Sequence, residues 1–211
     1  EETTEIFKYE IFDDFDNVNF GCLKKAGGYA QDVEIIAEKT LPSIPTLICS
    51  TIKYGLAQSF HRQSQFKNHY TAYDDGAKLV YLRGEIQYGS LDNGTELGEY
   101  TLKHFRPYGI RGDTVAQFIP TNLGSEDSGE NAFNLNSAAQ ITAWRNALEK
   151  CYNHLKMDES NSIRFIYVLG YPIEEFRPSA IFFHFKCFSR NGEEGGETME
   201  GKIGNRGKRP S

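Results

Sequence analysis

The most informative stretch of the sequence runs from Tyr108 to Glu149, YGIRGDTVAQFIPTNLGSEDSGENAFNLNSAAQITAWRNALE. An Arg-Gly pair closes a predicted strand, and residues 120–133 then form a polar run of turn-forming residues without periodicity. A loop of this length inside a compact domain usually has a function or is mobile. After the loop, an Asn-Leu-Asn segment leads into an amphipathic helix. We therefore expect a strand and a helix that are joined through a long loop, which is either functional or mobile.

The helix gives the clearest signal in the sequence. Apolar side chains recur at helical spacing and form one stripe, at Ile141, Trp144, Leu148, Cys151, Tyr152 and Leu155. Ser137 and Gln140 have the spacing of a capping box, which predicts that the helix starts at Ser137. The position of Trp144 within the stripe predicts that its ring packs in the core.

Other segments predict strands around this helix. Residues 70–73 and 77–88 flank an Asp-Asp-Gly turn signal, which predicts a hairpin. Residues 163–169 and 180–188 are almost continuously apolar and aromatic. This pattern is typical of central strands that are buried on both faces.

Residues 80–190 resemble the DNA/RNA non-specific endonucleases of the ββα-metal superfamily. That family has an Asp-Arg-Gly-His motif, a loop with Gly and Asp, an Asn-Leu segment, and a helix that opens Asn-x-x-x-Trp-x-x-Leu-Glu. The corresponding residues here are Arg111-Gly112, Asn134-Leu135, Trp144 and, before a Phe-rich strand, Arg177-Pro178. The resemblance implies an α+β, ββα-metal nuclease-like fold, with a central antiparallel sheet flanked by helices.

The resemblance also implies a mechanism, metal-assisted hydrolysis of phosphodiesters. In the family a neutral histidine takes a proton from water near neutral pH, Mg²⁺ neutralises phosphate charge, and an arginine stabilises the pentacovalent state. Here Asp113 occupies the position of the histidine, whereas Arg111 is retained to position a phosphate. A solvent-accessible carboxylate with a pKa of about 4 is a weak base for water, so we expect hydrolysis to be slowed by about 10²–10⁴.

Amide side chains are the candidates for a metal site. Gln140 corresponds to the metal-binding asparagine of the family, and its amide oxygen lies about 1.5 Å further out, which an octahedral Mg²⁺ site tolerates poorly. Its alternative role is to cap the helix. Asn134 and Asn136 are the other candidates for metal or phosphate contact, and asparagines at such a junction also serve as turn and capping residues. Mg²⁺ is the expected cofactor if one of these amides retains the site.

Further candidates come from the basic side chains. His104 is the imidazole nearest to Asp113 in the sequence, and it lies on a predicted strand or its turn. It is the alternative base for hydrolysis, although a single histidine on a strand is more often structural. The candidates for phosphate contact are Arg106, Arg111, Arg145 and Arg177.

Composition defines the protein class and the domain organisation. The chain has 211 residues, 39% of them hydrophobic, and a net charge of −6. This excludes a disordered chain, and no apolar run is long enough to span a membrane. Residues 1–50 carry ten acidic residues against four lysines, whereas the remaining residues balance at 19 of each sign. We expect an acidic segment over 1–50 packed on the main domain, an endonuclease-like domain over 51–190, and a flexible, Gly-rich charged tail over 191–211.

Cysteine usage and one sequon favour a processed, secreted protein. The four cysteines show no zinc-binding spacing, and their even number suits two disulfides, for example Cys22 with Cys49 and Cys151 with Cys187. Four buried free thiols are the alternative. Asn93 begins an Asn-Gly-Thr glycosylation sequon.

These inferences lead to three functional hypotheses. The first is a secreted nuclease-like protein that binds DNA or RNA with weak or absent hydrolysis. The second is an active Mg²⁺-dependent endonuclease that uses another base, such as His104. The third is a toxin, effector or inhibitor module that recognises a protein partner, which the negative net charge supports.

Overall fold

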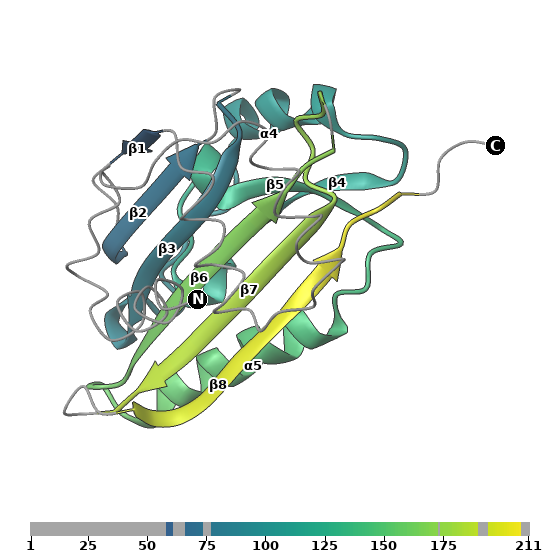
Figure 1. Ribbon diagram of the computed structural model, residues 1–211. Coiled ribbons are helices and arrows are strands. Elements are labelled where there is room, and N and C mark those ends of the chain that lie inside the picture. The colour runs from purple at the N-terminus through teal and green to yellow at the C-terminus, as the bar shows by residue number, and fades with distance from the viewer. Residues whose placement is uncertain (1–57, 61–65, 74–76, 173, 190–193, 208–211) are drawn as a thin grey trace.

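The computed structural model describes residues 58–60, 66–73, 77–172, 174–189 and 194–207 (Figure 1). The predicted acidic segment over residues 1–50 lies outside the described residues, and so do Cys22 and Cys49.

A six-stranded antiparallel sheet forms the centre of the molecule, in the order β1-β2-β3-β6-β7-β8. Its strands are β1 (Gln58–Phe60), β2 (Lys67–Tyr73), β3 (Leu79–Gln87), β6 (Ser162–Gly170), β7 (Ala180–Phe188) and β8 (Glu194–Gly204). The predicted hairpin is confirmed as β2 and β3, and the two predicted central strands are confirmed as β6 and β7. Both central strands are buried along nearly their whole length, which explains why their sequences lack polar alternation.

A second, two-stranded sheet precedes the long helix in the chain. It consists of β4 (Asp113–Gln117) and β5 (Ala132–Asn136), in a register that pairs Asp113 with Asn136. Helix α5 (Thr142–Met157) follows and packs on β6, β7 and β8 (Figure 1). The shorter elements are η2 (Tyr88–Ser90), α4 (Glu99–Phe105), η3 (Arg106–Tyr108), η4 (Thr121–Leu123) and η5 (Gly129–Asn131). The predicted α+β class, a central antiparallel sheet flanked by helices, is confirmed.

The buried face of α5 agrees with the predicted stripe. Trp144, Leu148, Cys151 and Leu155 are buried, and Ile141 and Tyr152 pack at the edge of the same core. The Trp144 indole donates a hydrogen bond of 2.9 Å to the hydroxyl of Tyr167, which in turn donates to the carbonyl of Phe118 at 2.7 Å. Trp144 is therefore a core residue that also joins α5 to the sheet and to the end of β4.

The predicted start of the long helix is wrong. The helix begins at Thr142, and its N-cap, Ile141, makes no side-chain capping bond. Asn136 forms a turn of its own instead, since its Oδ1 accepts from the amide of Ala138 and its carbonyl accepts from the amide of Ala139, both at 3.0 Å. These bonds hold the chain in a non-helical turn, so Gln140 lies outside the helix and caps nothing.

Two other expectations need correction. The segment before Asp113 is helical, as α4 and η3, so His104 lies on a helix and the Arg-Gly pair precedes β4 instead of closing a strand. The predicted flexible tail is wrong over residues 194–204, which pair with β7 as strand β8. Met199 and Ile203 point inward along β8 while Glu200 and Lys202 are exposed, a strand alternation that the glycines and charges concealed. The main domain therefore extends past residue 190.

The hydroxyl of Tyr167 can be tested by replacing the residue with Phe. This variant loses the link between the Trp144 indole and the Phe118 carbonyl, and both of these polar groups stay buried. Because two buried polar groups lose their partner, we expect the free energy of unfolding in urea to fall by about 1–3 kcal/mol. The matched control is Tyr152→Phe, whose hydroxyl bonds Asp92 at an exposed position and should cost less than about 0.5 kcal/mol. Equal losses for the two variants would contradict the linking role of Tyr167.

Candidate functional site

The turn that precedes β4 has a fixed backbone. Gly112 has a φ of +90°, in the region where side chains are strained, and a Cβ at this position would lie 3.1 Å from the hydroxyl of Ser137. The amide of Asp113 bonds the carbonyl of Ile110 at 3.0 Å, and the Gly112 carbonyl accepts from the amide of Ser137 at 2.9 Å. The turn is therefore tied to the start of β4 and to the end of β5, and only glycine suits its third position.

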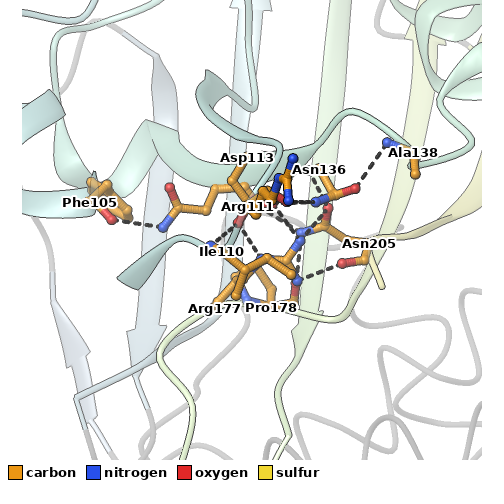
Figure 2. A network of polar contacts seen from close by, with 10 residues as sticks. Phe105, Ile110, Arg111, Asp113, Asn136, Ala138, Arg177, Pro178 and Asn205 are labelled. Atoms are coloured by element: carbon orange, nitrogen blue, oxygen red, sulfur yellow. Dashed lines mark hydrogen bonds and ion pairs between the residues drawn. The ribbon is translucent and has the colours of Figure 1, made fainter. Parts of the chain in front are cut away.

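The Asp113 carboxylate stands at the centre of a polar network (Figure 2). Its Oδ1 accepts from Nδ2 of Asn136 at 2.8 Å and from Nη2 of Arg177 at 2.9 Å. Its Oδ2 accepts from the backbone amide of Ile110 at 3.0 Å and from Nε of Arg177 at 2.5 Å. Four donors therefore occupy the carboxylate, two of them from one guanidinium in a bidentate pair.

Asn205 completes the network from the far end of the chain (Figure 2). Its carbonyl accepts from Nη1 of Arg177 at 2.6 Å, and its Oδ1 accepts from the backbone amide of Asn136 at 2.8 Å. Its Nδ2 donates to the carbonyls of Asn134 and Pro178, at 2.7 and 2.8 Å. Asn205 is fully buried, so it joins the end of β8, the turn at residues 177–179 and strand β5.

The surroundings of Asp113 lower the pKa of its carboxyl group. Burial by itself raises the pKa, but hydrogen bonds from Arg177, Ile110 and Asn136, together with the charge of Arg177, outweigh it. The Asp113 side chain is only 3% exposed and that of Arg177 only 5%. The expectation of a solvent-accessible carboxylate is therefore wrong, because the guanidinium and the amides surround it. Arg177, which was expected to contact phosphate, is also buried, and its guanidinium bonds Asp113 and the carbonyl of Asn205 instead.

The described residues do not fit a Mg²⁺ ion at this position. Asp113 is the nearest carboxylate, but the guanidinium of Arg177 neutralises it and would repel a divalent cation. The side-chain amide of Asn136 is fully used, since its Oδ1 accepts from the amide of Ala138 and its Nδ2 donates to Asp113. Of the two asparagines, only Asn134 has a side-chain oxygen that accepts no hydrogen bond from the described residues. Among those same residues, no group of three His, Cys, Asp or Glu side chains could hold a metal. Hard cations take several oxygen ligands, which these residues do not supply.

A polar hollow of about 390 Å³ opens beside Asp113. Its lining residues are Leu102, Arg106, Gly109, Ile110, Asp113, Thr114, Val115 and Asn134. The structure thus brings three predicted site residues, Arg106, Asp113 and Asn134, to one depression. Arg111 is exposed on the adjoining turn, and Asn136 supports Asp113 from across the hairpin.

Other predicted site residues lie elsewhere. His104 is exposed on α4 and lines a separate cavity of about 430 Å³, which contains neither Asp113 nor Asn134. Arg145 is exposed on the first turn of α5, and Gln140 is exposed before that helix. Neither residue lines the polar hollow.

The predicted pairing of Cys151 with Cys187 is wrong, because both residues are free thiols. Both are buried between α5 and the sheet, where burial raises the pKa of the Cys187 thiol to about 11 and that of Cys151 well above its usual value. They pack as small apolar side chains. Asn93 is exposed, and its amide donates to the carbonyl of Gly89 at 3.0 Å. Its glycosylation, and the secretion that the sequon favours, stay predictions.

No helix in the described part of the chain is long and apolar enough to cross a membrane.

Prediction from the ion pair. Asp113→Asn leaves the guanidinium of Arg177 buried without its counter-charge. We expect the free energy of unfolding, measured in urea near neutral pH, to fall by roughly 3–5 kcal/mol. The control is Arg106→Gln, which breaks an exposed ion pair with Glu99 at 3.4 Å and should cost less than about 1 kcal/mol. A loss for Asp113→Asn as small as that of the control would show that the pair does not hold the site.

Prediction for pH. The pKa of Asp113 is lowered in the folded state, so its stabilising effect is complete above the unfolded pKa of 3.8 and disappears as the pH falls through the lower folded pKa. The stability difference between the wild type and Asp113→Asn should therefore shrink below a pH of about 4. Urea unfolding curves recorded from a pH of about 6 down to about 2 measure this difference. Parallel pH profiles for the two proteins would contradict the lowered pKa.

Comparisons with known proteins give structural matches only. No family model matches the sequence, and no curated protein matches it. NucA from Streptococcus agalactiae with a magnesium ion bound matches with a TM-score of 0.46 and 11% identity over 72% of this chain and 78% of that one. An extracellular endonuclease matches with a TM-score of 0.45 and 10% identity over 69% and 84% of the two chains. The Sda1 nuclease with a bound zinc ion matches with a TM-score of 0.43 and 12% identity over 72% and 75%. The chain is thus similar in structure to nucleases at a level that carries no functional argument.

Proposed function

We propose that this domain binds nucleic acid through its phosphates at the open end of the β4–β5 hairpin, and that it hydrolyses phosphodiesters weakly or not at all. The observation that carries the proposal is the Asp113 carboxylate, which four donors occupy at the position where the resemblance places a catalytic histidine.

The state of Asp113 supports the absence of hydrolysis. A general base needs an available lone pair within reach of the water and a pKa near the working pH. The carboxylate of Asp113 has neither, because its lone pairs accept hydrogen bonds and its pKa is lowered further from neutrality. Asp113 instead holds Arg177 in place. This structural role excludes proton transfer, which is the function of the histidine at this position in the family.

The cations around the hairpin end support phosphate binding. Arg111 is exposed on a turn whose backbone is tied at Ile110 and Gly112, and its guanidinium forms no ion pair with another described residue. Arg106 lines the adjoining polar hollow, and its exposed contact with Glu99 is weak enough for a phosphate to compete. Guanidinium groups bind phosphate with two hydrogen bonds, and a fixed turn reduces the entropy lost on binding.

The two other hypotheses have less support from the described residues. An active endonuclease with His104 as base would need the imidazole and the phosphate site to share one depression, whereas His104 lines a different cavity. A protein-binding module needs no cationic hairpin end. Nucleic-acid binding without hydrolysis agrees both with the exposed arginines and with an Asp113 carboxylate that is fully hydrogen-bonded.

Prediction for binding. Arg111→Gln should weaken binding to plasmid DNA and to RNA by about tenfold, because one charge-assisted phosphate contact is lost. The slope of log affinity against log salt should also decrease by about one. Fluorescence anisotropy over a salt series measures both quantities. Lys156→Gln is the matched control. It removes one exposed positive charge from the last turn of α5, outside the proposed phosphate site, and should leave both the affinity and the salt slope unchanged.

Incubation of the wild type with plasmid and RNA, with Mg²⁺ or with EDTA, tests the catalytic half of the proposal. We expect the substrates to stay intact, or to be degraded only slowly, under both conditions. Rapid degradation that requires Mg²⁺, survives Asp113→Ala and is lost in His104→Ala would overturn this half and favour the active endonuclease. The absence of any complex at low salt would overturn the binding half and favour a protein partner.

A further inference from the structure

We infer that the nucleic acid bound by this domain is single-stranded, and that its bases stack on a row of exposed rings on α4, on η3 and on the turn before Arg177. The row, called the aromatic track below, consists of Tyr100, His104, Tyr108 and Phe176. The inference rests on the proposed function and names the form of nucleic acid that the same surface recognises.

The rings of the aromatic track are unusually exposed for their size. Tyr100 is 87% exposed, Phe176 49% and Tyr108 43%. Single exposed aromatic residues are ordinary, but a contiguous group on one surface marks an interaction site. The described core is already rich in rings, with Phe118, Phe133 and others fully buried, so these four are not required there.

The rings also follow one another along the surface. Tyr100 and His104 are four residues apart on α4 and share one helix face, with a rise of about 6 Å between them. The ring centroids of His104 and Tyr108 are 6.0 Å apart, and those of Tyr108 and Phe176 are 5.3 Å apart. Helix α4 therefore sets the direction of the aromatic track, and the turn before Arg177 continues it.

The scaffold under the aromatic track is fixed before any ligand binds. Asp127 accepts hydrogen bonds from the hydroxyl of Thr101 at 2.7 Å and from the backbone amide of Gly98 at the start of α4. At the other end of the segment, Nδ2 of Asn134 donates to the carbonyl of Phe105 at 2.8 Å. Rings carried on such a rigid element lose little entropy on binding.

The aromatic track borders a cavity that could accept one base. His104, Phe105, Tyr108 and Phe176 are among the residues that line it, and its volume is about 430 Å³. This volume lies within the range of pockets that bind small molecules. A base displaced from the row could therefore enter the cavity and stack against its rings.

The charges around the aromatic track favour a polyanion over a neutral ligand. Lys103 and Arg106 alternate with the rings in the sequence of α4 and η3, where both contact the exposed carboxylate of Glu99, at 3.7 and 3.4 Å, and Arg111 follows on the next turn. Aromatic and basic side chains interleaved in this way are typical of surfaces that bind single strands. Glu174 and Glu175, exposed beside Phe176, repel phosphate from that side. The sugar-phosphate chain would accordingly run along the α4 side.

Only a single strand can use this surface fully. Bases in a duplex are already stacked within the helix, so a duplex offers exposed rings nothing but its backbone. Unpaired bases can splay out and stack on tyrosine, phenylalanine or histidine. The exposed rings therefore distinguish single-stranded nucleic acid from duplex DNA.

Fluorescence anisotropy with a labelled oligothymidylate of about 16 nucleotides, and with a duplex of the same length, tests the inference. We expect tighter binding of the single strand. Tyr108→Ala and Tyr100→Ala should each weaken it about tenfold, with little effect on duplex binding, whereas Tyr108→Phe should retain it. Met157→Ala is the control, since this side chain is 74% exposed at the end of α5 and should change neither affinity. Tyr100 is exposed enough for its variant to report binding independently of folding.

Two results would overturn the inference, and they are distinguishable from each other. If the single strand and the duplex bind equally with steep salt dependence, and both tyrosine variants bind like the wild type, the surface recognises phosphate alone and the proposed function survives. If neither oligonucleotide binds at low salt, the proposed function fails and the inference fails with it.

Discussion

The bidentate ion pair between Asp113 and Arg177 fixes the hairpin end on which the functional surface is built. Both side chains are almost completely buried, and burial of two charges is tolerated only when their hydrogen-bonding groups find partners. The partners come from the turn at Ile110, from Asn136 on β5 and from Asn205 after β8. Segments that are distant in the sequence, around residues 113, 136, 177 and 205, therefore meet at one ion pair, which holds the exposed Arg111 turn in place.

This arrangement has a chemical consequence. A side chain that anchors a buried cation cannot also exchange protons with water, because any protonation would leave the guanidinium unpaired. The ion pair thus stabilises the scaffold at the position where the resemblance implies an activated water. The surface that is left presents arginines and exposed rings, which suit contact with a nucleic-acid chain and require no reaction.

Local pattern predicts some elements of this protein and fails for others. The buried stripe of α5 and the strands β6 and β7 follow from periodicity and composition, which are properties of neighbouring residues. The sequence predicts Arg111, Asp113 and Asn136 as site residues, and the structure brings Asp113 and Asn136 into contact. The burial of Asp113 is not predictable, because its partner Arg177 lies 64 residues away. Asn205 was missed entirely, since no sequence signal distinguishes a buried asparagine within a Gly-rich charged segment. The predicted capping box at Ser137 and Gln140 is wrong for a similar reason. Asn136 bonds the amide of Ala138 and holds this segment in a turn, which the spacing of Ser137 and Gln140 does not indicate.

A double-mutant cycle on Asp113 and Arg177 measures whether the two buried charges stabilise the hairpin end as a pair. The free energies of unfolding of the wild type, Asp113→Asn, Arg177→Gln and the double variant give the coupling between the two side chains. We predict a coupling of about 2 kcal/mol or more, with the double variant losing much less stability than the sum of the single losses. A coupling below about 0.5 kcal/mol would contradict the account, because the two charges would then act independently and the hairpin end would need another anchor.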